Sequence, residues 1–104
     1  MRTDSTLGVI FFTRKKRNDP EILDIYVRIT VNKERSEFSI KRDISVCNWD
    51  IFRCRAKETS ENLILLNTYL DDVHAEVLNA HKQLHSERKL ITAKAIKLRY
   101  FGED

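Results

Sequence analysis

The chain has 104 residues, of which 34% are charged and 41% hydrophobic, and a formal net charge of +3. This length accommodates one domain with a modest core, and the many aromatic and β-branched residues exclude a disordered tail. No apolar run approaches the roughly 20 residues of a membrane-spanning helix and the N-terminus has no signal-peptide pattern, so we expect a cytoplasmic protein with no membrane partner.

The first predicted element is a strand over residues 6–14, which carries apolar side chains on both faces. We favour the face of Leu7, Val9 and Phe11 as the one that enters the core. The next six residues, KKRNDP at 15–20, combine a run of cations with strong turn formers. They predict a cationic loop at the end of a hairpin, although a charge run in a loop is most often simply solvated.

The second predicted strand, over residues 23–31, contains the strictest alternation in the chain. Its period of two predicts a buried face made of Ile25, Val27, Ile29 and Val31. The other face carries Tyr26, Arg28 and Thr30, whose phenol, guanidinium and hydroxyl groups can all donate hydrogen bonds. Such a face suits ligand recognition, but polar residues also alternate on ordinary half-exposed strands, so the pattern leaves both interpretations open.

A third strand is predicted over residues 35–41, after a tight turn in which Asn32 takes a positive φ. With Phe38 in the core, the alternation sends a polar set to the face that carries Arg28. That set consists of Arg35, Glu37, Ser39 and Lys41. Together the three hairpin-linked strands predict an antiparallel sheet over residues 6–41.

Residues 42–57 show no period and predict a segment that covers one edge or end of the sheet. Its apolar side chains are Ile44, Val46, Trp49 and Phe52. Residues 59–85 follow the period of an amphipathic helix, with Thr59 or Ser60 as its N-cap. The apolar stripe consists of Leu63, Leu66, Leu70, Val73, Val77, Ala80 and Leu84. Such a helix spans about 40 Å, so its far end must pack beyond the sheet or stand in solvent.

A shorter helix is predicted from Thr92 to Phe101, with Gly102 as its stop. The predicted fold class is therefore α+β, a three-stranded antiparallel sheet packed on a long C-terminal helix, with a short final helix. We expect one domain over residues 1–90 and assign residues 91–104 to a short helix or the start of a linker. The abrupt end indicates one module of a longer protein.

Candidates for catalysis and metal binding are weak. Two glycines allow no phosphate-cradling loop, and no nucleophile-elbow, zinc-protease or P-loop string occurs. His74, His81 and His85 lie near one helical face, but no carboxylate or thiol completes a ligand set, so we expect a packing or solvated role. Cys47 and Cys54 form no CxxC pair. We therefore expect no metal and no cofactor.

Positive charge is concentrated in the first half, since residues 1–57 hold 13 Lys and Arg against 8 Asp and Glu, whereas residues 58–104 hold 6 against 8. The cations of the sheet and its loops are Arg14, Lys15, Lys16, Arg17, Arg28, Arg35, Lys41 and Arg42. A small antiparallel sheet fits the major groove of B-DNA, where arginine can read guanine and Glu37 can accept from cytosine. An RNA platform would need more stacking aromatics than Tyr26, so duplex DNA is favoured.

Several segments, taken in order, match one known family. They are VIFF at 9–12, RKK at 14–16, IYVRITVN at 25–32, EFS at 37–39, WD at 49–50, ITA at 91–93, IK at 96–97 and YFG at 100–102. The chain resembles the N-terminal arm-DNA-binding domain of tyrosine recombinases, the phage-integrase family, from conjugative transposons and other mobile elements. The resemblance covers essentially the whole chain. It departs from the family at Lys33 and at residues 18–20, where relatives often have glycine.

The resemblance implies that a three-stranded sheet, packed on a C-terminal helix, enters the major groove of arm-type sites during integration and excision. It implies contacts to bases or phosphates from Tyr26, Arg28, Thr30, Arg35, Glu37 and Ser39. The DNA-binding set is completed by Lys15, Lys16 and Arg17, which would bind the backbone, and by Arg14 and Lys41. The family's catalytic residues belong to a separate domain with no counterpart here, so we expect binding without cleavage. The implied partners are double-stranded DNA and other domains or protomers of the recombinase.

The alternative function is a protein-interaction or dimerisation module, in which the heptad-like helix 63–84 pairs with a partner and the basic sheet is incidental. A monomer whose stripe is covered by its own sheet favours the DNA-binding module. A third hypothesis, a small nuclease or metal enzyme, lacks residues that supply the chemistry. For the DNA-binding module we expect a monomeric, nucleoid-associated domain.

Overall fold

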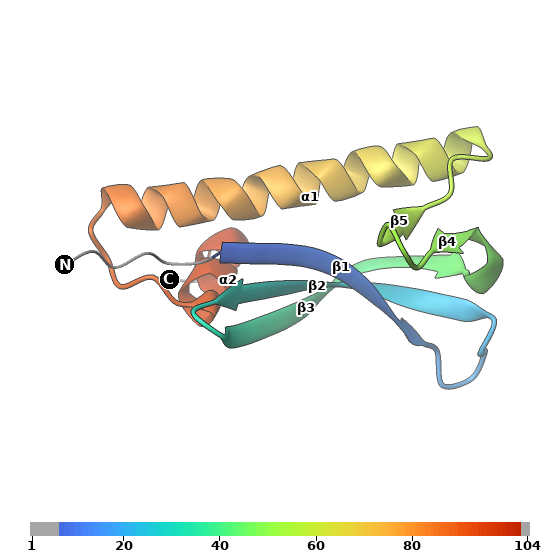
Figure 1. The fold of residues 1–104 in the computed structure, drawn as a ribbon, viewed down its shortest axis with the longest axis horizontal. Helices are drawn as coiled ribbons and strands as arrows, with labels where there is room; N and C mark the ends of the chain where they lie inside the picture. Colours follow the sequence, from blue (N-terminus) through green and yellow to red (C-terminus); the bar gives the residue numbers. More distant parts are fainter. Residues whose placement is uncertain (1–6, 103–104) are drawn as a thin grey trace.

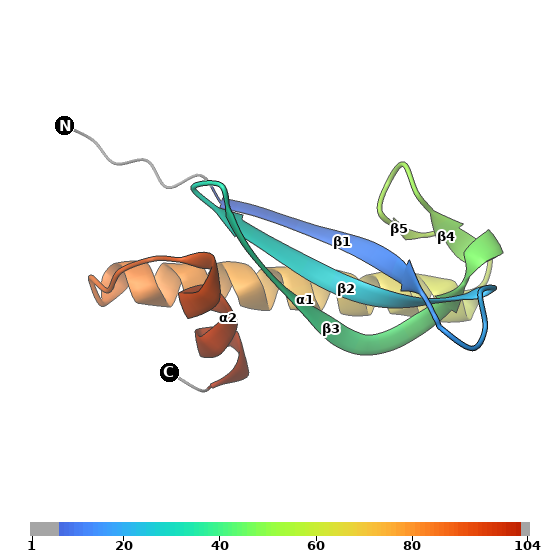
Figure 2. The ribbon, with the colours of Figure 1, turned by 90° about the horizontal axis from the view of Figure 1, so that it is seen from below.

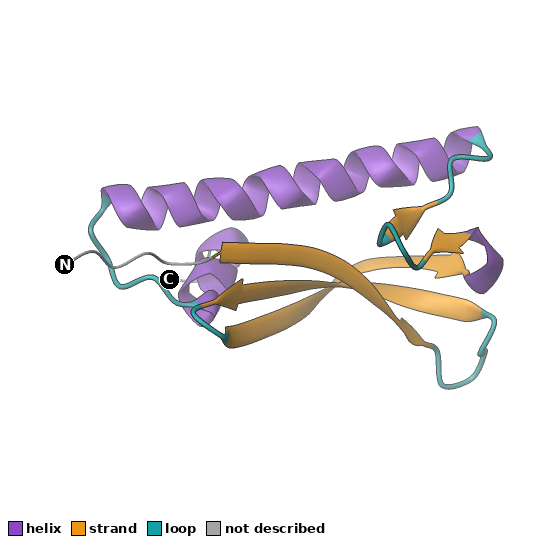
Figure 3. Cartoon of the chain, in the orientation of Figure 1, coloured by secondary structure: helices purple, strands orange, loops and turns teal. Residues whose placement is uncertain are grey.

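The structure, a computed structural model, describes residues 7–102. Its main sheet is antiparallel in the order β1-β2-β3, and the strands are β1 (Leu7–Lys15), β2 (Ile22–Val31) and β3 (Glu34–Ser45). Helix α1 (Glu61–Ser86) runs lengthwise along one face of the sheet, and α2 (Ala93–Phe101) packs between α1 and the sheet at one end (Figure 1, Figure 3). The predicted α+β fold class is confirmed. Residue 6, the predicted start of the first strand, and residues 103–104 lie outside the described range.

The core lies between α1 and the inner face of the sheet, and the alternation of β2 builds it. The buried residues of β2 are Leu23, Ile25, Val27, Ile29 and Val31. The register sets Val9 beside Ile29 and Phe11 beside Val27. Together with Leu7, these two β1 residues pack against the buried cluster. The predicted facing of the first two strands is therefore confirmed.

The connection from β2 to β3 and the end of β3 both contain residues with positive φ. Asn32 and Lys33 form a two-residue turn with φ values of 50° and 75°, a conformation whose twist matches that of the flanking strands. β3 runs four residues past the predicted end at residue 41. The prediction stopped there because a bulge interrupts the alternation of buried and exposed residues. Residues 40–42 stand opposite Ile25 alone, and Lys41 has a φ of 61°. Pairing with β2 resumes beyond the bulge. A sequence pattern with a period of two does not predict this part of the strand, because the bulge shifts the alternation.

The segment between the sheet and α1 forms a 3₁₀ turn, η1 (Val46–Asn48), and a small hairpin of β4 (Trp49–Asp50) and β5 (Arg55–Ala56). Trp49 is buried as predicted, and Ile44 is buried as part of β3. The prediction that Val46 and Phe52 cover the sheet is wrong, because both are exposed, Phe52 to 95%. The Asp50 carboxylate accepts hydrogen bonds from the backbone N–H groups at 52 and 53, and this turn holds Phe52 at the tip of a hairpin that projects beside β1 (Figure 2).

Helix α1 begins after Ser60, whose hydroxyl accepts a hydrogen bond from the backbone N–H of Leu63 at 3.3 Å. The predicted stripe is buried at every member from Leu70 to Leu84, and its first two leucines are partly buried. Asn67 is also buried, which was not predicted. Its side-chain amide donates to the carbonyl of Ala56 at 2.8 Å and accepts from the N–H of Ala56 at 2.9 Å. This amide therefore completes the hydrogen bonds of β5.

The far end of α1 packs on α2, which accounts for the length that the sheet cannot cover. The hydroxyl of Thr92 caps α2 by accepting from the N–H of Ala95 at 3.0 Å, and Gly102, with a φ of 72°, ends the helix as predicted. Two hydrogen bonds of 2.8 Å join the Arg99 guanidinium to the Glu87 carboxylate. These bonds are the main reason that the pKa of Glu87 falls to about 2, and they fix α2 to the end of α1.

Candidate nucleic-acid interface

The face of the sheet that points away from α1 gathers the side chains that alternate with the core. The strand register arranges them in rows across the three strands. The rows are Gly8, Thr30 and Arg35; Ile10, Arg28 and Glu37; and Phe12, Tyr26 and Ser39. We call these residues the outer face. The structure thus brings together every residue of β2 and of the first half of β3 that was predicted to point outward.

Glu37 lies between two guanidinium groups from different strands. Arg28 on β2 donates from Nε to one carboxylate oxygen at 2.7 Å, and Arg14 on β1 donates from Nη2 to the other at 2.9 Å. The hydrogen bond from Arg28 is the main reason that the pKa of Glu37 is lowered, and the nearby positive charges, Arg35 included, add to the effect. The ionised carboxylate therefore links all three strands across the outer face.

An aromatic pair, Phe12 and Tyr26, supports these cations from the next row. The two rings stack with their centroids 5.5 Å apart. The guanidinium carbon of Arg28 lies 4.5 Å from the Phe12 centroid, and that of Arg14 lies 4.9 Å from the Tyr26 centroid. Cation–π attraction of this kind helps to fix a guanidinium over the ring. Sequence reasoning missed Phe12, although assigning Phe11 to the core sends its neighbour outward.

Arg28 is fixed by these contacts but keeps donors for a ligand. Its Nε is bound to Glu37, while its two terminal Nη groups form no hydrogen bond within residues 7–102. A guanidinium in a fixed plane can form two parallel hydrogen bonds with a guanine edge or a phosphate. The side chain is 28% exposed, so a ligand can reach it.

Three consecutive cations at the end of β1 are in two different situations. Lys15, predicted to begin the loop, is instead the last residue of β1, and the loop begins with Lys16 and Arg17. Lys15 and Arg17 are exposed, whereas Lys16 is paired with carboxylates of the sheet. Its Nζ lies 2.7 Å from Asp24 Oδ1 and 3.6 Å from Asp43 Oδ2. The hydrogen bond to Asp24 is the main reason that the pKa of Lys16 is raised. Sequence reasoning missed this pairing because it depends on the register of β2 with β3.

The bulge in β3 determines where the last cations of the sheet lie. Lys41 is exposed at the bulge, and its backbone N–H donates to the Ser39 hydroxyl at 3.0 Å. Arg42 was counted among the sheet cations from the sequence. Its guanidinium instead lies over Tyr69 of α1, 4.4 Å from the ring centroid. Lys41 therefore borders the outer face, while Arg42 faces the helix layer.

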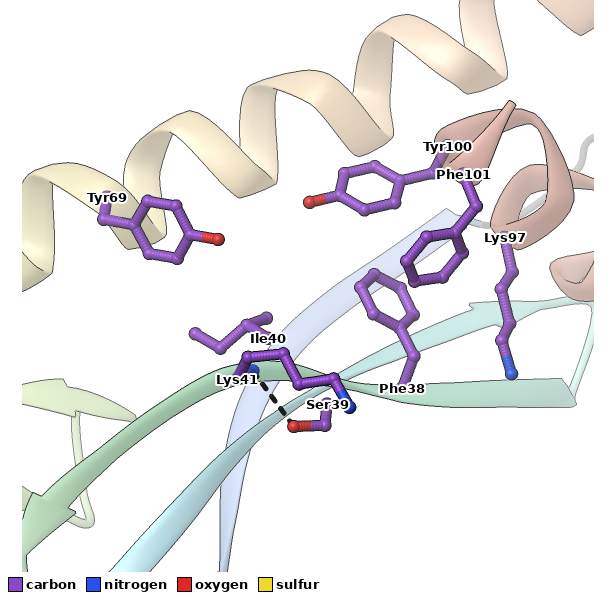
Figure 4. Close-up of a pocket in the computed structure, with 8 residues that line it drawn as sticks. All are labelled: Phe38, Ser39, Ile40, Lys41, Tyr69, Lys97, Tyr100 and Phe101. Carbon is purple, nitrogen blue, oxygen red and sulfur yellow. Dashed lines mark hydrogen bonds between the residues drawn. The ribbon is translucent and has the colours of Figure 1, made fainter. Parts of the chain in front are cut away.

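A groove of about 410 Å³ lies beside the outer face, between β3 and the two helices (Figure 4). It is lined by Phe38, Ser39, Ile40, Lys41, Tyr69, Lys97, Tyr100 and Phe101. The Phe38 ring contacts those of Tyr100 and Phe101, with centroids 5.0 and 4.9 Å apart. Lys97 reaches from α2 to donate a hydrogen bond of 3.0 Å to the backbone carbonyl of Glu37.

The histidines of α1, His74, His81 and His85, were the best metal candidates in the sequence. Within residues 7–102, no group of three His, Cys, Asp or Glu side chains is placed to hold a metal ion. Cys47 and Cys54 are free thiols. No helix in the same range is long and apolar enough to cross a membrane.

The family model described as the arm DNA-binding domain matches residues 11–97. The match runs from the middle of β1, through the whole of α1, into α2. Comparisons with curated proteins and with solved structures gave no match. The resemblance drawn from the sequence is confirmed, and DNA is the partner that this family implies. The chain therefore belongs to the arm DNA-binding domain family.

Proposed function

We propose that the outer face docks in the major groove of duplex DNA at arm-type sites and thereby anchors a tyrosine recombinase during integration and excision of a mobile element. A separate domain of the recombinase would perform strand exchange. The observation that carries this proposal is the fixed guanidinium of Arg28, which is held by Glu37 and stacked on Phe12 at the centre of the outer face.

The width of the sheet supports the major groove as the docking site. Three strands with a spacing of about 4.8 Å are about 10 Å across, and the major groove is about 12 Å wide. Other DNA-binding proteins place β-ribbons in the same groove. The minor groove, at about 6 Å, is too narrow for three strands side by side.

In this position Arg28 reads a guanine through its two Nη groups. Both oxygens of Glu37 are bound to arginines, so we assign it the role of holding Arg28 and Arg14 in place. Recognition of a cytosine amino group by Glu37 would require it to release one of these arginines. The remaining polar groups of the outer face come from Tyr26, Thr30, Arg35 and Ser39.

The exposed cations in and around the outer face are proposed to bind phosphates. They are Arg14, Lys15, Arg17, Arg35 and Lys41. Lys16 is assigned to the fold instead, because two carboxylates already surround its ammonium group. Five phosphate contacts predict that log K falls against log salt with a slope of about −4.5.

A salt titration of the 104-residue chain on a labelled random duplex, followed by fluorescence anisotropy between about 50 and 200 mM salt, measures this slope. Lys15→Ala should reduce it by about 0.9, since one phosphate contact is lost. Lys16→Ala, at the next residue, is the matched control and should leave the slope unchanged. A slope near zero for the unaltered chain would contradict DNA binding by these cations.

Arm-site recognition needs a second measurement. We expect footprinting on DNA that flanks the parent gene to reveal protected repeats in the presence of competitor duplex. Uniform protection that competitor removes would restrict the module to nonspecific binding.

The alternative function, dimerisation through helix residues 63–84, is less well supported. The stripe is buried inside the chain's own core from Leu70 to Leu84, so these residues cannot pair with a second helix. The exposed apolar residues of α1, Ile64, Leu65 and Leu78, lie outside the stripe. We therefore expect sedimentation at low concentration to give a monomer. A tight dimer with an interface along α1 would favour the alternative.

We propose that α2 belongs to the same module, beyond the predicted boundary at residue 90. Lys97 is bound to β3 and Arg99 to the end of α1, so α2 is tied to both layers. By binding DNA, the whole module would reside at the nucleoid.

A further inference from the structure

Ile10 is an exposed apolar side chain on β1, an edge strand of the largely polar outer face. It is 45% exposed and lies directly opposite Arg28 in the neighbouring strand. Gly8, two residues before it on the same face, has no side chain. Phe12, two residues after it, is covered by the stacked ring of Tyr26 and by the Arg28 guanidinium. Ile10 is therefore not shielded by its neighbours along the strand.

A single exposed apolar residue is ordinary on a protein surface and needs no explanation by itself. Ile10 differs because its cross-strand neighbour is the guanidinium that the proposed function places against a base. A β-branched side chain is also stiff at χ1, so it presents a fixed apolar surface. In the major groove, the apolar group that a base pair offers is the 5-methyl group of thymine.

We infer, on the basis of the proposed docking in the major groove, that Ile10 contacts a thymine methyl group and makes the module select thymine beside the guanine read by Arg28. Neighbouring strands are about 4.8 Å apart and successive base pairs about 3.4 Å, so the two side chains reach base pairs one or two steps apart. The module would then recognise two neighbouring base pairs, a thymine through the apolar contact of Ile10 and a guanine through the paired hydrogen bonds of Arg28.

Replacement of thymine by deoxyuridine tests this inference, because it removes the methyl group and leaves base pairing intact. Duplexes selected by the 104-residue chain from a randomised pool are resynthesised with one thymine at a time replaced. We expect one replacement to weaken binding about fourfold, the effect of losing one buried methyl-sized group. That thymine should lie within two base pairs of the guanine whose replacement affects the unaltered chain but not Arg28→Ala.

Ile10→Ala is expected to lose the same factor on the thymine duplex and to bind the thymine and deoxyuridine duplexes equally. Ile64→Ala is the matched control, since Ile64 is the same residue type and 46% exposed but lies on α1, away from the outer face. It should keep the full preference for thymine. Circular dichroism of both variants checks that the fold is retained.

The outcomes separate this inference from the proposed function. Equal binding of the thymine and deoxyuridine duplexes by the unaltered chain at every position overturns the inference, while salt-dependent duplex binding leaves the proposed function standing. A preference for thymine that persists in Ile10→Ala overturns the role of Ile10. Failure of the unaltered chain to bind any duplex overturns both.

Discussion

The two faces of the sheet are built from alternate residues of the same strands, yet they are stabilised in different ways. The inner face buries aliphatic side chains such as Val27 and Ile29, and its contribution grows with the apolar area removed from water. The outer face keeps charged groups near the surface and links them through Glu37. Ion pairs at a surface contribute little to folding, so these groups can exchange partners with a ligand at small cost. If the outer face binds DNA as proposed, alternate residues of one strand serve stability and recognition.

Truncation of the inner face should have the largest effect, and it should act on stability. Ile29→Ala leaves a cavity in the core, so we expect urea-induced unfolding to show a loss of about 2–5 kcal/mol. Thr30→Ala, the next residue on the other face, is the matched control and should cost about 0.5 kcal/mol or less. Equal losses for these two variants would contradict the division between the faces.

Truncation of the outer face should act on DNA binding instead. Arg28→Ala is expected to weaken binding of the selected duplex by about 1–3 kcal/mol and to relax specificity at one base pair, with little change in unfolding. Arg53→Ala removes the same charge from the β4–β5 turn, where the side chain is 78% exposed, and should have a smaller effect. Anisotropy titrations at one salt concentration compare the two. An equal loss of affinity in the two variants would mean that Arg28 acts only as a positive charge and reads no base.

Glu37→Gln should sharpen the comparison further, because it keeps the shape of the side chain and removes its charge. We expect binding of random duplex to rise about two- to fivefold, a surface-charge effect of about 0.5–1 kcal/mol. Discrimination between selected and random duplex should fall, since Arg28 loses the carboxylate that orients it. Competition titrations measure both quantities. Unchanged discrimination would mean that the Phe12 ring alone orients Arg28.

The pH dependence of stability should show the smallest effect. Hydrogen bonding to Arg28 lowers the pKa of Glu37 below its ordinary value of 4.5, so the folded state favours the ionised carboxylate. Its stabilisation is complete above pH 4.5 and is lost as the pH falls through the lowered pKa of the folded state. Thermal unfolding of the unaltered chain and Glu37→Gln should therefore differ at neutral pH and converge in acid. A difference that persists in acid would have a cause other than the ion pair.

The elements whose side chains repeat with a fixed period could be predicted from the sequence. β2 alternates without a break, and the apolar positions of α1 recur every three or four residues. In both elements one face is buried and the other is not, so the spacing of the hydrophobic residues predicts both the type of element and its buried face. The outward set around Arg28 could be identified for the same reason.

Features that depend on contacts between distant residues could not be predicted. The ammonium group of Lys16 forms ion pairs with carboxylates of β2 and β3, and only the register of these strands brings the two carboxylates together. The bulge at residues 40–42 ends the alternation in mid-strand and turns Arg42 toward the helices. Phe52 has a large apolar side chain of the kind usually found in a core, but the hydrogen bonds of Asp50 place it at the tip of a turn. Residue type alone does not distinguish a phenylalanine in a core from one on a tip.

The hydrogen bond from Lys97 to the backbone carbonyl of Glu37 links the last helix to the middle row of the outer face. This contact ties α2 to β3 at the residue whose carboxylate holds Arg28 and Arg14.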